Sequence, residues 1–188
     1  TVQNATFSGA VTATSNAAIE DGILEAGLTA NADTTVTLTD VVSFDNQTFE
    51  SKAGAVIVLA SDFEVVVNSS NARLTVKGPG LLNGSSNSIS ISALTLGDTA
   101  KGNISNASIT GGSVTVAVAD SALENVTLSS VLTTTAQTQL RGTVALLGGS
   151  SAASKIVVQD GAVIDAADQT IAGVIDVGAA TVRNATFN

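Results

Sequence analysis

A four-residue word recurs along this chain at intervals close to multiples of 20 residues. The word reads asparagine, any residue, serine or threonine, then a large apolar residue, and it begins at Asn4, Asn46, Asn106, Asn125 and Asn184. The intervals between these asparagines are 42, 60, 19 and 59 residues. A fixed period of about 20 residues is typical of solenoids, in which each repeat forms one coil and stacks on its neighbours. The sequence therefore predicts a stack of coils.

The segments between these words resemble short strands. Short runs of residues alternate between apolar and polar side chains, as in 34–42, 88–96 and 181–187, and glycine, asparagine, serine and aspartate separate them. The segment 77–86 contains the single proline and predicts the sharpest corner. The segment 17–27 is the best candidate for a short helix, because Ile19, Ile23 and Leu24 share a helical spacing.

These patterns predict one all-β domain over residues 1–188, a parallel β-solenoid of about nine coils of about 20 residues. In such a stack an asparagine at one corner of every coil can hydrogen-bond to its neighbours above and below. We therefore expect Asn4, Asn46, Asn106, Asn125 and Asn184 to form a structural ladder at one corner. The alternative is a β-sandwich or jelly roll, which also has many short strands separated by turns.

Composition narrows the possible functions. The chain has no cysteine or histidine, so disulfides and thiolate or imidazole metal sites are excluded. Net charge is −9 and the seven cations are scattered singly, which argues against nucleic acid as a partner. The longest apolar run, 53–60, is far shorter than the roughly 20 residues that span a bilayer, so we expect no membrane insertion. Neither an initiator methionine nor a signal peptide is evident, and we expect a processed chain or part of a longer product.

Two segments carry a resemblance to a known family. Residues 74–84 read LTVKGPGLLNG, and residues 104–109 read ISNASI. This succession of a strand, a glycine-containing turn and an Ile-x-Asn-x-Ser-Ile strand resembles right-handed parallel β-helix proteins of the pectin-lyase-like type. The resemblance implies an architecture, which in that family serves lyases, hydrolases, adhesins, phage tailspikes and capsid decoration proteins. Because one fold hosts many functions, it implies no particular chemistry.

Acidic residues offer the main candidates for catalysis or metal binding. The densest group is Asp160, Asp165, Asp168 and Asp176, and a second pair is Asp62 and Glu64. Glycosidases use paired carboxylates, but aspartate beside glycine or alanine more often caps a turn. Asp21-Gly22 and Asp160-Gly161 stand alone, without the repeated loop of a calcium site. We therefore expect no enzyme activity, no catalytic residue, no metal and no cofactor.

The two ends of the chain carry nearly the same word. Residues 2–7, VQNATF, and residues 182–187, VRNATF, match at five of six positions, which predicts that the chain starts and stops at the same phase of its coil. Because a solenoid end is an open sheet edge, we expect a second subunit or another protein to cover it.

The function that we expect is that of a non-enzymatic structural surface protein, such as a phage capsid decoration or fibre component. Its location would be a virion surface, or an extracellular or cell surface. Its expected partners are further copies of itself, a capsid or surface protein, or a host-surface glycan. The alternatives are a cell-surface adhesin or filament subunit, and a polysaccharide-binding or -degrading β-helix.

Overall fold

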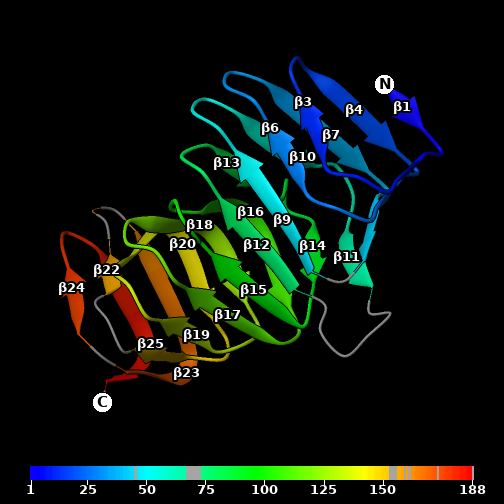
Figure 1. The fold of residues 1–188 in the computed structure, drawn as a ribbon. Coiled ribbons are helices and arrows are strands. Elements are labelled where there is room, and N and C mark those ends of the chain that lie inside the picture. Colours follow the sequence, from blue (N-terminus) through cyan, green and yellow to red (C-terminus); the bar gives the residue numbers. More distant parts are fainter. Residues whose placement is uncertain are drawn as a thin grey trace.

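A computed structural model describes residues 1–44, 46–66, 73–152, 156–158, 160, 162–172 and 174–187. The described residues contain 25 β-strands and no helix, and the strands pair in parallel from one coil to the next. The chain climbs as a β-solenoid of about nine turns, with its termini at opposite ends of the stack (Figure 1). The predicted parallel solenoid is confirmed, and the sandwich alternative is wrong because its strands would pair antiparallel.

Each coil has three strand positions, which we name faces A, B and C in chain order. Face A contains β1 (Val2–Gln3), β4 (Ala17–Glu20), β7 (Thr35–Thr39), β10 (Val56–Leu59), β13 (Leu81–Asn83), β22 (Ile156–Val158) and β24 (Ile175–Val177). Face B contains β2 (Thr6–Phe7), β5 (Ile23–Leu24), β8 (Val42–Phe44), β11 (Phe63–Val66) and β14 (Ser88–Ser90). Face C contains β3 (Val11–Ala13), β6 (Leu28–Ala30), β9 (Asn46–Ser51), β12 (Arg73–Lys77), β15 (Ala93–Leu96), β17 (Ser113–Val116), β19 (Leu132–Thr134) and β21 (Ser150–Ala152).

Five longer strands turn a corner and so contribute to two faces. Strands β16 (Asn103–Thr110), β18 (Ser121–Leu128) and β20 (Thr138–Leu146) run from face A into face B. Strands β23 (Val163–Ile171) and β25 (Thr181–Phe187) run from face B into face C. These continuous strands join the three faces into one sheet.

The length of a coil varies along the stack. Paired residues lie 17 positions apart at Val2 and Ile19, 25 apart at Ile57 and Leu82, and 19 apart at Ile104 and Leu123. The predicted period of about 20 is thus an average over unequal coils. The differences arise at the corners, because the paired strands themselves keep their register.

The core is a set of aliphatic columns that run along the inside of the solenoid. On face A one column contains Ile57, Leu82, Ile104, Leu123 and Leu140, which are buried and paired from coil to coil. Alternate residues point outward, because successive side chains of a strand lie on opposite faces of the sheet. The same alternation on every coil gives one continuous interior.

The corner at residues 78–80 joins face C to face A, as the sequence predicts. Gly78 has φ +104°, a left-handed conformation that favours glycine. A Cβ atom on Gly80 would lie 2.4 Å from the carbonyl oxygen of Lys52 in the coil below. The glycines therefore permit a tight turn and a close approach between coils.

The candidate helix at 17–27 is not formed, because this segment contains β4 and β5. Asp21 takes φ +50° between the two strands and turns the chain from face A to face B. Ile19 and Leu24 are both buried, but each points inward from a different face. The helix-like spacing of apolar residues thus reflects a corner between two short strands.

We expect Leu94→Ala to lower the free energy of unfolding by about 2–5 kcal/mol, because it leaves a cavity in a fully buried column. The matched control is Thr95→Ala, which changes the neighbouring outward residue of β15 and should cost less than about 1 kcal/mol. Chemical denaturation followed by circular dichroism measures both. Equal losses for the two variants would contradict the described core.

Candidate functional site

The corner between faces A and B is built from residues in the left-handed conformation. Asn4, Asp21, Asp40, Asn106 and Asn125 all have φ between +50° and +52° there. Asparagine and aspartate adopt this conformation more readily than other non-glycine residues, because their short polar side chains can bond to local backbone. The recurring asparagine of the sequence thus lies where the backbone must adopt the left-handed conformation.

Asparagine side chains also join successive coils at this corner. Asn106 Nδ2 donates to Asn83 Oδ1 at 3.2 Å, and Asn125 Nδ2 donates to Asn106 Oδ1 at 3.2 Å. Asn125 Oδ1 in turn accepts a hydrogen bond from the backbone N–H of Thr143, at 3.0 Å, in the next coil. Asn106 and Asn125 therefore donate to the coil below, and Asn125 also accepts from the coil above. We call this series the amide ladder.

The five predicted ladder residues do not all lie at one corner. Asn4, Asn106 and Asn125 lie between faces A and B, whereas Asn184 lies between faces B and C within β25. Asn46 begins β9 on face C, and its side chain lies outside the described part of the structure. Because the coils differ in length, residues at a constant spacing in the sequence do not all lie at the same corner of the solenoid.

Sequence reasoning missed Asn83, which is the first residue of the amide ladder. Asn83 is followed by glycine and serine, so it has the asparagine and hydroxyl of the repeated word but lacks the apolar fourth residue. Its carboxamide also accepts a hydrogen bond from the backbone N–H of Ser85, at 3.0 Å. A search for asparagine followed two residues later by a hydroxyl residue would have found it.

A related arrangement lies at the last corner, where Asp165 takes the place of an asparagine. Asp165 Oδ1 accepts from the backbone N–H of Ala167 at 3.0 Å and from Asn184 Nδ2 at 3.1 Å, and its Oδ2 accepts from Arg183 Nε at 3.0 Å. The hydrogen bond from Ala167 and those from Asn184 and Arg183 lower the pKa of Asp165, because they stabilise the carboxylate. This carboxylate closes the corner and is bonded to three donors.

The other predicted acidic residues lie at separate places on the coils. Asp160 accepts a hydrogen bond from the backbone N–H of Ala179, at 2.8 Å. Asp168 has φ +64° and lies at the corner between faces B and C. Asp176 lies on face A, in β24. Asp62 accepts from the backbone N–H of Ser88, at 2.7 Å. Gly161 and the side chain of Glu64 lie outside the described part. Asp62 and Asp160, like Asp165, thus bond to backbone at the turns.

Two shallow hollows mark the sides of the solenoid. One crosses face A over Val56, Leu81 and Ala122, with Glu124 and Arg141 beside it, and Glu124 is the one carboxylate among its lining residues. The other lies at the corner between faces A and B and contains Asp40 and Asp62. In the described residues no three acidic side chains gather to hold a metal ion. Nor does the described chain contain a helix of the length and hydropathy that a membrane span needs.

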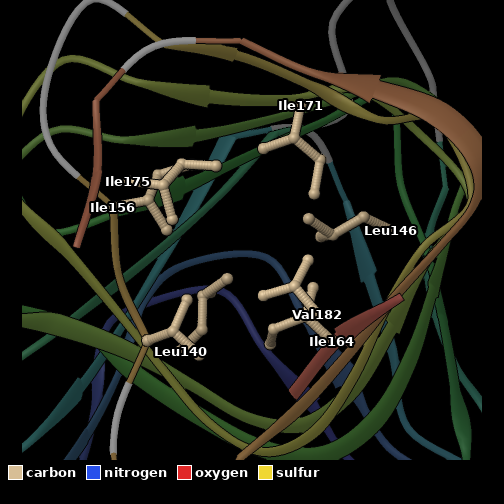
Figure 2. A pocket seen from close by; sticks show the side chains of 8 residues that line it. Leu140, Leu146, Ile156, Ile164, Ile171, Ile175 and Val182 are labelled. Carbon is tan, nitrogen blue, oxygen red and sulfur yellow. The ribbon is translucent and has the colours of Figure 1, made fainter. Parts of the chain in front are cut away.

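The last coil leaves apolar side chains uncovered. Phe187 is 59% exposed and Val177 is 43% exposed, although both belong to inward-facing columns. Beneath them, eight aliphatic side chains from the last coils surround a small hollow in the core. Figure 2 shows these side chains pointing toward one another, with Ile175 and Val182 from β24 and β25 among them. The core therefore reaches the open edge formed by β24 and β25.

The amide ladder gives a stability prediction at Gly142, which has φ +60°. A Cβ atom there would lie 2.1 Å from Asn125 Oδ1, so we expect Gly142→Ala to cost about 2–4 kcal/mol of unfolding free energy. In an Asn125→Gly background the same change should cost only about 1–2 kcal/mol, because only backbone strain remains. Denaturation of all four proteins gives the coupling, and independent effects would contradict the contact.

The lowered pKa of Asp165 gives a pH prediction. A carboxyl group whose pKa is lower in the folded state than its unfolded value of about 3.9 stabilises the fold above that value. The contribution is lost as the pH falls through the folded pKa. We therefore expect the stability of the wild-type protein to fall more steeply below about pH 4 than that of Asp165→Asn. Thermal unfolding at several pH values from about 6 to 2.5 tests this, and parallel curves would contradict it.

Comparison of the chain with protein-family models, with curated proteins and with solved structures found no match.

Proposed function

We propose that this protein is a non-enzymatic structural component of a virion or cell surface and that it assembles through the ends of its solenoid. The observation that carries the proposal is the uncovered apolar edge of the last coil. An open parallel edge presents unpaired backbone N–H and C=O groups, and here exposed core residues accompany it. Such an edge favours pairing with another strand, and burial of Phe187 and Val177 would add to the stability of that pairing.

The described solenoid also suits a structural role. Its coils repeat one hydrogen-bonding pattern, and its corners are joined by the amide ladder, so that stability accumulates coil by coil. The carboxylates of Asp62, Asp160 and Asp165 are bonded to backbone at corners. These hydrogen bonds support a role for the three aspartates in stabilising the corners of the solenoid.

The surface on which the protein would be displayed is proposed from sequence resemblance. Residues 74–84 and 104–109 resemble right-handed parallel β-helix proteins of the pectin-lyase-like type, a fold that serves phage tailspikes and capsid decorations among other proteins. The preference for a virion is based on composition, because the chain is rich in small and β-branched residues and has no cysteine. A phage capsid decoration or fibre is the form we favour, and a cell-surface adhesin or filament subunit is the alternative. Both alternatives give the protein the same structural role and differ in whether it is located on a virion or on a cell.

The hollow on face A supports a second candidate, binding of a polysaccharide. It is an extended depression with an apolar floor, and the polar groups of Asn103, Glu124 and Arg141 lie around it. Hydrolysis of a glycosidic bond commonly uses two carboxylates, and Glu124 is the one carboxylate among the described residues that line this hollow. The geometry therefore favours sugar binding over cleavage.

Light scattering on the purified chain, residues 1–188, over a concentration series tests the assembly proposal. We expect the mean mass to rise with concentration, because end-to-end contacts add copies by mass action. A protein that remains monomeric at every concentration would contradict assembly through the ends. Titration with neutral and acidic polysaccharides would then test the hollow on face A, with Arg141→Ala as the variant that should weaken binding.

A further inference from the structure

We propose that the last corner of one copy is continued by the first corner of a second copy, so that VQNATF at residues 2–7 pairs in parallel and in register with VRNATF at residues 182–187. This inference rests on the proposed assembly through the ends and specifies its register. It places Val2 opposite Val182, Asn4 opposite Asn184 and Phe7 opposite Phe187. The contact is head to tail, so the same two edges remain free for further copies.

The two words have the same backbone conformation. Each consists of a strand, an asparagine with φ +52°, and a second strand: β1, Asn4 and β2 in the first coil, and both halves of β25 around Asn184 in the last. Two chains that turn at the same position with the same dihedral angle can remain paired on both sides of the corner. The paired strands of β16 and β18 do so around Asn106 and Asn125.

The two words also face the interior with the same residues. Val2 and Phe7 pair with the buried Ile19 and Leu24 of the coil above them. Val182 and Phe187 pair with the buried Ile164 and Ile171 of the coil below. Pairing the words would therefore place valine on valine and phenylalanine on phenylalanine along the inward columns. It would cover Phe187, which is 59% exposed, and Val2, which is 45% exposed.

The hydrogen-bond direction of the amide ladder supports the same polarity. Within the chain, Nδ2 of the upper asparagine donates to Oδ1 in the coil below, as Asn125 donates to Asn106 and Asn184 donates to Asp165. The carboxamide oxygen of Asn125 accepts from the coil above. By this pattern Asn184 Oδ1 is the acceptor for the next coil, and Nδ2 of Asn4 in the second copy is its donor.

The register has a geometric consequence. Asn184 lies between faces B and C, whereas Asn4 lies between faces A and B. The second copy is therefore rotated by one face, about one third of a turn, relative to the first. In this arrangement β1 lies on the face B part of β25, β2 lies on its face C part, and β3 lies on β24.

The test uses charge changes at the two edges. Asn4→Asp removes the amide donor but keeps the corner, since Asp21 and Asp40 occupy it with φ +50°. Phe187→Glu places a charge on the exposed phenylalanine of the opposite edge. We expect each variant to raise the concentration needed for assembly by about tenfold or more. The matched control is Val131→Glu, which charges an exposed residue of an internal coil, between β18 and β19, and should leave assembly unchanged.

Mixing the two variants distinguishes a head-to-tail contact from a symmetric one. Asn4→Asp retains an intact C-terminal edge, and Phe187→Glu retains an intact N-terminal edge. Sedimentation velocity should therefore show monomers for each variant alone and dimers for an equimolar mixture. No dimer in the mixture would overturn the head-to-tail contact.

The remaining outcomes separate this inference from the proposal on which it depends. Loss of assembly with Val131→Glu, together with normal assembly of the other two variants, would place the contact on the side of the solenoid and overturn the register. Normal assembly of all three variants would overturn the edge contact while assembly by another surface persists. A wild-type chain that never assembles would overturn both the inference and the proposed function.

Discussion

Parallel, in-register hydrogen bonding between successive coils is the interaction on which this structure depends. It fixes which residues lie above one another, and a pleated strand then sends alternate side chains inward. Inward columns such as Ile57, Leu82 and Ile104 follow from this register, and together they form the core. A shift of one residue in any coil would turn its apolar set outward, so the register and the core support each other.

At the corners of the coils, the need to keep this register restricts which residues can be present. A coil must turn sharply without losing its alignment with the coils above and below. Asn106 and Asn125 meet both needs, because they adopt the left-handed conformation and their amides bond from coil to coil. Gly142 continues the same corner where a side chain would collide with Asn125. The repeated word is therefore a signature of architecture.

The same constraint distinguishes the last coil of the described residues from the internal coils. Every internal coil has its backbone groups and apolar columns covered from both sides, whereas the edge of β24 and β25 is covered from one side. The features that would complete this edge are a strand, a left-handed corner and a second strand with inward apolar residues. Residues 2–7 provide them, which is why we infer a second copy as the partner.

The sequence by itself determined the fold class, because a hydrophobic alternation with period two and a recurring asparagine word restrict a chain to stacked strands. It also indicated a corner within residues 77–86 through its glycines and proline, and the structure places this corner at 78–80, between β12 and β13. It did not determine where around the coil each word lies, because paired residues range from 16 positions apart at Gln169 and Ala185 to 27 apart at Gln47 and Leu74, and only the pairing of strands shows this. The tertiary structure alone decided that residues 17–27 form two strands, that Asn83 belongs to the amide ladder, and that Asn184 turns a different corner from Asn4. Each of these depends on contacts between residues about one coil or more apart, which local sequence patterns do not record.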